Sequence, residues 1–409
     1  MRTNELKERL DLFRQTELPR LQRLSAYFAG NHPILAETKE PGKPQNRLVN
    51  NFCRSITDST VGYFMGIPVT YGGNDPATLA EVIRICGIND ESFVNSALAA
   101  DLSVYGRACE LLWCDNAGEV RFTAVSPETV FPILSDDVDE SVIGAVRTFR
   151  KRDGNVMVQY ADHEKICDFV DSSGSLEQVN EREHYFGVVP VNFYRNNREM
   201  VGDFEPVLTL VDAYNTLQSE CVNDFELFAD SYLAISGMGG TTVEDMEKLR
   251  RERVLLLDEG GDAKWLTKSV NDQYIENLKT RIAKDIYRFS GTADIAEVDG
   301  PGSLTSGIAM KYRLVNFENR VAVTEQFFRR GLMHRFAIIA SLYSALGREF
   351  DHRSLKMTFT RNLPGNSEAA ADLAAKLDGI VSRKTLLELL PFVDSADAEM
   401  ERLGGEVNG

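Results

Sequence analysis

Residues 306–346 read SGIAMKYRLVNFENRVAVTEQFFRRGLMHRFAIIASLYSAL, and this stretch decides the fold because its pattern predicts one long helix. Taken as continuous, about 40 residues at about 1.5 Å each would span about 60 Å, which exceeds the diameter of a typical small domain. Gly331 is the position inside the stretch where we expect a kink. A helix of this length needs neighbours that cover it, so the rest of the chain or further copies must supply them.

A second long helix is predicted over residues 203–230, DFEPVLTLVDAYNTLQSECVNDFELFAD, whose apolar side chains recur at helical spacing. The other positions carry acidic side chains and no Lys or Arg, and such a face repels polyanions. The acidic residues are Asp203, Glu205, Asp212, Glu220, Asp224, Glu226 and Asp230.

Helix periodicity returns over residues 271–289, where the charged side chains include Lys279, Arg281, Lys284 and Arg288. The two helices therefore bracket a compact module. Within this module the sequence predicts a short helix and then a hairpin, with strands RVLLLD and AKWLT on either side of the turn EGGD.

The segments before residue 203 predict a body that mixes helices and strands. Residues 5–29 have helical spacing with a break at Pro19, and a further helix is expected to run through Leu48, Phe52, Ile56 and Ser59 to Gly66. Helix signals dominate residues 78–102, whereas residues 107–195 read as short strands separated by turns. The fold class is therefore α+β and rich in helix.

Composition narrows the class of protein. The 409 residues carry 45 Lys and Arg against 62 Asp and Glu, a net charge of −17, which argues against a basic clamp on nucleic acid. With 43% hydrophobic and 26% charged residues, the chain predicts two or three folded domains. No uninterrupted apolar run of about 18 residues occurs, and the first residues lack a secretory signal, so we expect a protein that stays where it is made.

The six cysteines are dispersed and form no C-x-x-C pair, which favours reduced thiols over a disulfide framework or a zinc cluster. Cys109 and Cys114 lie in the strand-like segment RACELLWCD, and we expect both to belong to the core.

No motif of an enzyme stands out. The phosphate loop G-x-x-x-x-G-K-[ST] is absent, and its nearest imitation, GPGSLTSG at residues 300–307, lacks the lysine. We interpret that segment as a loop that lines a surface or channel, with a plain connector or a phosphate site as alternatives. The acidic residues Asp136, Asp137, Asp139 and Glu140 could hold a divalent cation, although capping a solvated hairpin is the simpler interpretation. We therefore predict no catalytic residue, no metal and no cofactor.

A basic group lies inside the bracketed module, interleaved with acidic side chains. It could dock a partner, or it could be a balanced surface held by ion pairs. We take docking as the working hypothesis for Lys248, Arg250, Arg251, Arg253 and Lys264.

Several segments resemble tailed double-stranded-DNA bacteriophage portal proteins, of the type found in long-tailed siphophages. The resemblance rests on NRLVNN at 46–51 with GYFMGIPVTY at 62–71, on DIYRFS at 285–290, and on SGIAMKY at 306–312. A weaker similarity, VSRKTLLELLP, lies at 381–391, so the resemblance covers nearly the whole chain.

The resemblance implies a ring, usually of twelve subunits, at one vertex of the capsid, through which double-stranded DNA is packaged and later ejected. Such a ring is a conduit and not an enzyme. It implies four further partners, namely the terminase, head-completion adaptors, the major capsid protein and the scaffolding protein. It also implies a location in the virion after assembly in the host cytoplasm, without a membrane.

The resemblance also implies a division of the chain into a wing, a stem of two helices, a clip between them, a tunnel loop and a crown. The expected boundaries are 1–202 for the wing, 203–233 for the first stem helix, 234–269 for the clip, 270–292 for the second stem helix, 293–305 for the tunnel loop, 306–365 for the rest of the wing and 366–409 for a short helical crown.

Three guesses about residues follow. The tunnel loop would approach DNA, the clip would carry the docking residues named above, and unlike charges on the two stem helices would pair between neighbouring subunits. The loop residues are Ser303, Leu304 and Thr305, and the stem residues are Glu220, Asp224, Lys284 and Arg288. An acidic cellular scaffold without a channel and a metal-dependent hydrolase remain as alternatives.

Overall fold

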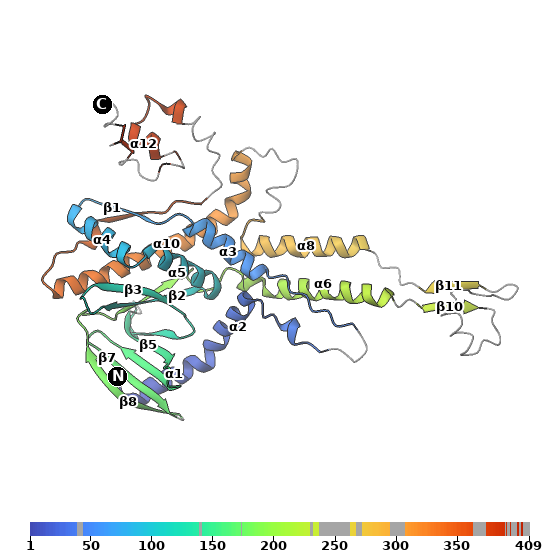
Figure 1. Cartoon of the computed structure of the whole chain (residues 1–409), viewed down its shortest axis with the longest axis horizontal. Coiled ribbons are helices and arrows are strands. Elements are labelled where there is room, and N and C mark those ends of the chain that lie inside the picture. Colours follow the sequence, from blue (N-terminus) through green and yellow to red (C-terminus); the bar gives the residue numbers. More distant parts are fainter. Residues whose placement is uncertain are drawn as a thin grey trace.

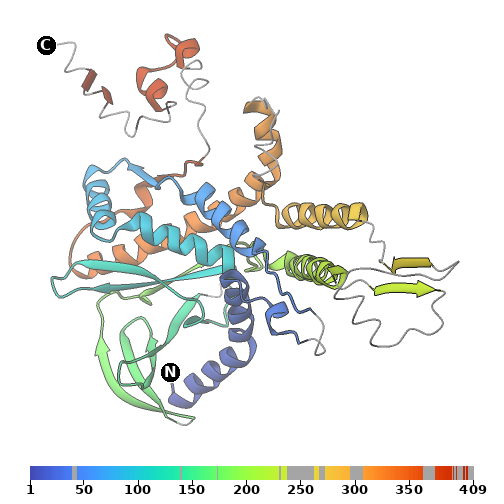
Figure 2. The same ribbon diagram turned by 45° about the vertical axis from the view of Figure 1, so that its right-hand side comes forward.

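The computed structural model consists of a mixed α+β body from which a pair of helices projects (Figures 1 and 2). The C-terminal residues with α12 (Arg383–Glu388) lie apart from this body, at the top of the same view. The structure describes residues 1–38, 44–138, 141–172, 174–229, 232–236, 262–266, 272–294, 307–362, 374–388, 390, 393, 399–400 and 402–403.

The chain begins with two helices that meet at Glu17. This confirms the break predicted near Pro19, which occupies the first turn of the second helix. Asn51 and Asp75 cap two later helices by accepting hydrogen bonds from the following backbone N–H groups. The elements are α1 (Thr3–Thr16), α2 (Leu18–Ala29), η1 (Pro33–Ala36), α3 (Phe52–Met65), α4 (Pro76–Ile88) and α5 (Glu91–Tyr105).

Two antiparallel sheets form the rest of the body. One has the strand order β3-β2-β9 and the other the order β4-β5-β6-β7-β8, so sequence neighbours pair almost throughout. The predicted run of short strands is confirmed. The strands are β2 (Arg107–Cys114), β3 (Val120–Val125), β4 (Val130–Leu134), β5 (Val142–Arg150), β6 (Val156–Ala161), β7 (Lys165–Ser172), β8 (Ser175–Glu183) and β9 (Val191–Arg195).

Two large hydrophobic clusters and a smaller one hold the body together. One packs α1 and α2 onto the five-stranded sheet, with Phe13 stacked on Phe131 at 4.4 Å between ring centroids. The other surrounds the long helix and joins it to α3, α4, α5 and the three-stranded sheet. Each sheet therefore receives helices on one face, and the smaller cluster of Cys109, Val130, Ala145, Val189 and Val191 joins strands of the two sheets.

The long helix is α10 (Gly307–Ala345), a single element of 39 residues, as predicted. Most of α10 crosses the body, and the helix bends near its N-terminal end, so that its first turns point away from the body (Figure 1). Gly331 serves close packing, because a Cβ at this position would lie 2.1 Å from Cδ1 of Tyr194 on β9. The chain then returns through η3 (His352–Ser354) to β12 (Leu355–Thr358), which pairs with β1 (Thr70–Gly73).

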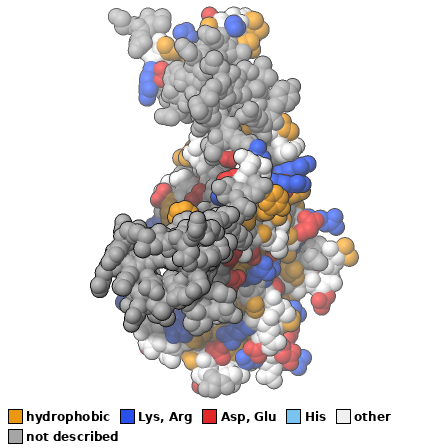
Figure 3. All heavy atoms as spheres, turned by 90° about the vertical axis from the view of Figure 1, so that its right-hand side faces the viewer, with side chains coloured by type: hydrophobic (Ala, Val, Ile, Leu, Met, Phe, Trp, Pro, Cys, Tyr) orange, Lys and Arg blue, Asp and Glu red, His pale blue; other side chains and the backbone are white. Residues whose placement is uncertain are grey.

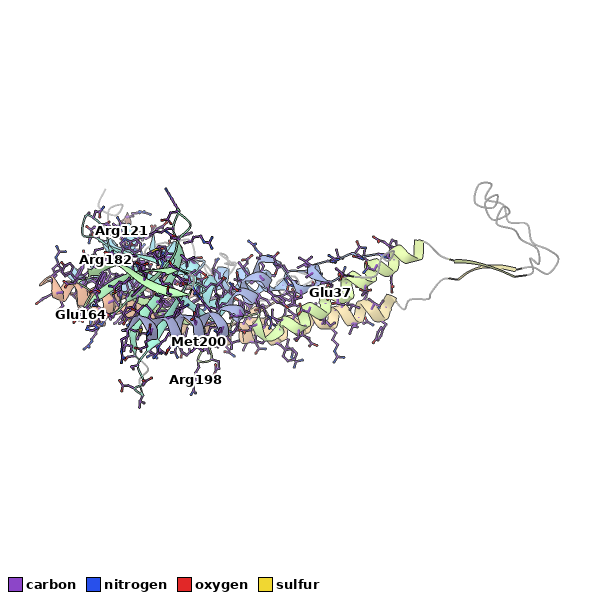
Figure 4. All side chains as sticks on the ribbon, turned by 90° about the horizontal axis from the view of Figure 1, so that it is seen from below. Glu37, Arg121, Glu164, Arg182, Arg198 and Met200 are labelled. Carbon is purple, nitrogen blue, oxygen red and sulfur yellow. The ribbon has the colours of Figure 1, made fainter. Side chains whose placement is uncertain are left out.

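The projecting pair consists of α6 (Leu208–Ala229), which follows η2 (Glu205–Val207), and α8 (Asp272–Ser290). They run side by side in opposite directions in both views (Figures 1 and 4). Beyond them β10 (Tyr232–Ser236) and β11 (Asp262–Leu266) form an antiparallel pair.

Three details of the sequence interpretation are wrong. Leu48 lies in an extended segment, because α3 begins only at Phe52, and the first stem helix ends at Ala229 instead of continuing to residue 233. Cys114 is exposed, since it ends a strand at the edge of the body, whereas Cys109 is buried as expected. The predicted strand over 263–267 exists as β11, which pairs with β10. The strand predicted at 253–258 lies outside the described residues.

The six cysteines all lie among the described residues and are free thiols. None of the described helices has an apolar run long enough to cross a membrane.

Candidate functional site

The projecting helix pair and its attachment to the body form the candidate functional site. The pair exposes three large aromatic side chains, a kind of surface that partner proteins often bury. Phe225 on α6 is 77% exposed, and Tyr274 and Phe289 on α8 are 65% and 62% exposed. The pair therefore presents surface suited to burial by a partner.

Ion pairs and hydrogen bonds fix the first turns of α6 to the N-terminal helices. Arg20 on α2 holds Glu205 with two hydrogen bonds, from Nε at 2.8 Å and from Nη2 at 2.5 Å. Tyr27 donates to Asp212 at 2.7 Å. Together with Asp203, which is also paired, these residues account for three of the predicted acids. That part of the acidic stretch is used inside the subunit, so the prediction of a continuous acidic outer face is wrong there.

His32 adds a buried link between η1 and α6. Burial lowers its pKa below the ordinary value, so the neutral ring can both donate and accept. Its Nε2 lies 3.2 Å from the Tyr27 carbonyl oxygen, and its Nδ1 lies 3.1 Å from Nδ2 of Asn215. The Nε2–H tautomer satisfies both contacts.

An extended segment, residues 44–50, runs along α6 and is bonded to a polar stripe on that helix. Four helical residues advance about 6 Å and two extended residues about 6.6 Å, so alternate backbone N–H groups meet every fourth helical side chain. Figure 4 shows Glu37, at the start of the same connector, beside the projecting helices. The bonds join Asn50 N to Asn215 Oδ1 at 2.7 Å, Leu48 N to Ser219 Oγ at 2.9 Å and Asn46 N to Asn223 Oδ1 at 2.7 Å.

Arg320 on α10 links the body to the two chain segments at the base of the helix pair, one before its first helix and one after its second. Its Nη1 lies 2.5 Å from Oδ1 of Asp203, just before the first helix. Its Nη2 donates to Oγ1 of Thr60 on α3 at 2.7 Å and to Oγ1 of Thr292, just after α8, at 3.3 Å. Gly291 adopts a φ of +65° beside the aliphatic part of Arg320. One side chain thus joins α3, α10 and the two segments at the base of the helix pair.

A second arginine of α10, Arg335, is fully buried with two carboxylates. It lies 3.0 Å from Glu91 and 2.7 Å from Glu110, and it donates to Asn95 at 2.8 Å. Tyr194 donates to Glu110 at 2.8 Å. Burial alone would lower the pKa of Arg335, but the surrounding negative groups, led by Glu110, raise it well above its ordinary value. This cluster fixes α10 to α5 and β2.

A third arginine, Arg361, holds the segment that leads toward the C-terminus. It forms hydrogen bonds from both Nε and Nη2 to Glu318 and an ion pair with Glu325 at 2.8 Å, both on α10. Tyr63 on α3 donates to Glu318 at 2.6 Å. The segment that follows β12 is therefore bound to α3 and α10.

A groove of about 750 Å³ opens between α8 and α10. Its α8 wall carries Arg281, Lys284 and Arg288, and its α10 wall contains Asn316 and Phe317. Lys and Arg side chains are also visible on the end of the molecule from which the pair projects (Figure 3). The groove therefore combines basic side chains with two acids, Asp285 and Asp294, and with the ring of Phe317.

The predicted site residues divide into two groups. Glu220 and Asp224 lie on α6, and Lys284 and Arg288 lie on α8, as expected. Lys264 lies in β11, opposite Ala234. The remaining predicted site residues lie outside the described residues; they are Ser303, Leu304, Thr305, Lys248, Arg250, Arg251 and Arg253.

The acidic loop gives no metal site among the described residues. Asp136 and Asp137 are exposed, and no group of three His, Cys, Asp or Glu side chains in the described part of the chain could hold a metal ion. Asp139 and Glu140 lie outside that part.

Sequence reasoning missed the polar stripe of α6 and the arginines of α10. The stripe could have been found, because Asn215, Ser219 and Asn223 recur every four residues within an otherwise apolar helix. The partners of Arg320 and Arg335 are more than 100 residues away in the sequence or on other elements, so no local pattern announces them.

The family model and the curated relatives agree on one family. Residues 11–407 match the family model described as phage portal protein, SPP1 Gp6-like. The portal protein of Bacillus phage SPP1 is 23% identical over 413 residues, covering 95% of this chain and 80% of that protein. The portal protein of Clostridium phage phiCD119 is 24% identical over 387 residues, covering 88% of this chain and 84% of that protein. A chain of the virion of a native gene transfer agent particle aligns with a TM-score of 0.49 and 15% identity, covering 92% and 94% of the two chains.

Proposed function

The chain belongs to the SPP1 Gp6-like family of phage portal proteins, and from this premise we propose that about twelve copies close into a ring around a channel for double-stranded DNA. Its function is that of a phage portal protein, whose general role is the DNA packaging channel. The family is structural and not enzymatic. DNA leaves through the same channel on ejection, and the ring occupies one vertex of the virion after assembly in the host cytoplasm.

The observation that carries the ring is the projecting helix pair. Phe225, Tyr274 and Phe289 are largely exposed in the single chain, and identical neighbours around a ring would cover such surface on every copy. In a closed ring every subunit has a neighbour on each side, so the same surface of the helix pair is covered on every copy.

Under this proposal the parts of the chain have separate tasks. The helix pair is the stem, residues 234–269 are the clip, residues 293–305 are the tunnel loop, and the body with α10 is the wing. Residues 366–409 form the crown. The match to the portal family over residues 11–407 supports this division.

The clip docks the terminase during packaging and head-completion adaptors afterwards, through Lys248, Arg250, Arg251, Arg253 and Lys264. The wing contacts the major capsid and scaffolding proteins. Ser303, Leu304 and Thr305 approach the DNA. Stem helices of neighbours pair through unlike charges, drawn from Glu220 and Asp224 on α6 and from Lys284 and Arg288 on α8. The net charge of −17 per copy limits adhesion of the DNA polyanion to the ring.

Negative-stain electron microscopy of the purified chain tests the proposal. We expect rings with a central hole about as wide as a DNA duplex. Because ring closure depends on concentration, a dilution series and added scaffolding protein belong to the experiment. A compact monomer under all these conditions would contradict the proposal and favour an acidic scaffold without a channel.

A further inference from the structure

The extended segment 44–50, which we call the strap, is bonded to α6 beside a buried histidine. Its last bond runs from the backbone N–H of Asn50 to Oδ1 of Asn215 at 2.7 Å. The Nδ2 atom of the same amide lies 3.1 Å from Nδ1 of His32. Asn215 and His32 are only 0% and 2% exposed, so water does not readily replace a hydrogen bond that is lost between them.

The strap fixes the direction of each hydrogen bond in this chain of contacts. A backbone N–H can only donate, so the Asn215 atom that faces Asn50 is the amide oxygen. The amide nitrogen then faces His32 and donates to Nδ1, which therefore carries no proton. The ring proton lies on Nε2 and is donated to the carbonyl oxygen of Tyr27, 3.2 Å away. The three contacts together require a neutral His32.

The surroundings of His32 determine when the ring becomes charged. Burial lowers the pKa of His32 below its ordinary value. The Tyr27 carbonyl, the Asp212 carboxylate on α6 and the Asn51 side chain at the start of α3 favour the charged ring and oppose this shift. Further charged or titratable groups on the neighbouring elements are Arg23 on α2, Glu37 after η1, Arg47 on the strap and Cys53 on α3. The ring is therefore neutral at neutral pH and takes up its proton in acid.

A proton on Nδ1 would place two donors against each other, because the Asn215 amide nitrogen also donates at this point. Half a turn of the amide removes the conflict, since Oδ1 then accepts from His32. The ring is less free to move, because it is bonded to the Tyr27 carbonyl and packs on the Tyr27 ring at 4.8 Å between centroids. After the turn the amide nitrogen faces the Asn50 N–H, and the strap loses that hydrogen bond.

A groove of about 480 Å³ gives solvent a route to this histidine. The groove is lined by residues of α2 and η1 and by the turn between them, and Tyr27, His32 and Leu35 are among them. A proton can therefore reach the ring while the body stays folded.

We propose that His32 and Asn215 form an acid-sensitive latch, in which protonation of the histidine turns the amide and releases the strap from α6 at Asn50. Ser219 and Asn223 continue to hold the rest of the strap, so release begins at the end that leads into α3. The latch goes beyond the proposed function and requires no ring, so the full single chain is sufficient to test it.

Backbone hydrogen exchange at about pH 7.5 and about pH 5.5 tests the latch, with each rate divided by the intrinsic rate at that pH. The released state binds the proton more tightly, and this interval brackets the ordinary histidine pKa of about 6.5. We expect the protection of the Asn50 amide to fall by up to about tenfold in acid. The amides of Leu48 and Asn46, which are bonded to Ser219 and Asn223, are matched internal controls and should change less.

Two substitutions separate the latch from other effects of acid. In His32→Asn a neutral amide can accept from Asn215 at both pH values, so the pH dependence at Asn50 should disappear. Asn215→Asp should reverse it, because a carboxylate accepts from the Asn50 N–H and from a charged imidazole together. His184→Asn is the matched control, because His184 is another histidine whose pKa burial lowers but is bonded to the Asp162 carbonyl, away from the strap. It should leave the response of Asn50 unchanged.

Three results would overturn the proposal. The first is equal protection of the Asn50 amide at the two pH values in the unsubstituted chain. The second is a fall in protection that persists in His32→Asn, since another group would then titrate. The third is a His32 ring that takes up its proton in a histidine NMR titration while Asn50 stays protected, because the ring would then have turned toward the groove. Far-UV circular dichroism checks folding, and His32→Asn decides alone if Asn215→Asp is unfolded.

Discussion

Arg335 shows how one buried cation determines the packing of a helix. Its neighbours Glu91 and Glu110 are both buried, so removal of the guanidinium would leave two carboxylates close together without a counter-charge. We expect Arg335→Met to lower the free energy of unfolding by about 3–5 kcal/mol, the usual cost of breaking a buried ion pair from one side. Chemical denaturation followed by tryptophan fluorescence would measure it.

Arg330→Met is the matched control, because Arg330 is exposed on the same helix. Its effect should stay within about 0.5 kcal/mol. Adding Glu110→Gln to Arg335→Met should recover part of the loss, since one of the uncompensated charges disappears. Equal effects of the two arginine substitutions would show that the buried cluster is not a determinant of stability.

Asp101 on α5 gives the body a dependence on pH. Burial, with a further contribution from Glu128, raises the pKa of this carboxyl from 3.8 to about 8. The folded protein therefore keeps a proton that the unfolded chain releases, and stability falls as pH rises from about 4 to about 8. The penalty is complete above pH 8 and absent below pH 4.

We expect Asp101→Asn to remove this dependence, because the amide has the shape of the protonated acid. At pH 8 and above, the variant should be more stable by about 1–3 kcal/mol, and near pH 4 the two proteins should be alike. Thermal unfolding across this range is the measurement, with Asp137→Asn on an exposed loop as the control. A constant difference between Asp101→Asn and the unsubstituted chain at every pH would refute the titration.

At the scale of elements, two helical glycines with different surroundings should respond in opposite ways to the same substitution. A Cβ at Gly62 on α3 would meet nothing within 4 Å, whereas at Gly331 on α10 it would lie 2.1 Å from the ring of Tyr194. Tyr194 is buried and bonded to Glu110, so the ring cannot give way easily.

Gly62→Ala should therefore stabilise the protein by about 0.5–1 kcal/mol through helix propensity alone. Gly331→Ala should destabilise it by about 1–3 kcal/mol, because overpacking outweighs the same gain in propensity. The two melting curves form one experiment, since each variant controls for the other. A stabilising Gly331→Ala would mean that α10 and β9 can separate without cost.

Apolar spacing predicted the elements correctly where a single helix or strand periodicity dominated. It predicted them less well where long-range packing determines the backbone conformation. The long helix, the two stem helices and the run of strands were all predicted from apolar spacing. The extended segment at 44–50 was not, because Leu48 and Phe52 also fit helical spacing. Its conformation depends on Asn215, Ser219 and Asn223, which bind its backbone from more than 160 residues away. Long-range partners of this kind leave no local signal.

The candidate site could be predicted only as far as its helices. Opposite charge on α6 and α8 was visible in the sequence, but Asp203, Glu205 and Asp212 looked like members of one acidic face. In the structure Arg320, Arg20 and Tyr27 bind them, so those acids serve the attachment of the stem. Glu220 and Asp224, which lie farther along α6, are the acids that we propose for contacts between subunits.

At the scale of the whole molecule, the stem and the body differ in how much apolar surface each buries. The body buries two large hydrophobic clusters, whereas the far part of the stem exposes Phe225 and Tyr274. Local opening costs least where few apolar contacts must be broken. The single chain should therefore be stable in its body and open readily in its stem.

Hydrogen exchange on monomers and on rings would show this difference. We expect α5 to exchange slowly in both states, because its inward face lies in the core around α10. Residues 221–229 and 272–281 should exchange fast in the monomer and at least tenfold more slowly in the ring, which corresponds to about 1.4 kcal/mol of added local stability. The comparison needs no substitution, so the unaltered chain is its own control. Equal protection of the stem in the two states would mean that neighbouring subunits do not cover it, and the contacts that close the ring would then have to lie in the body.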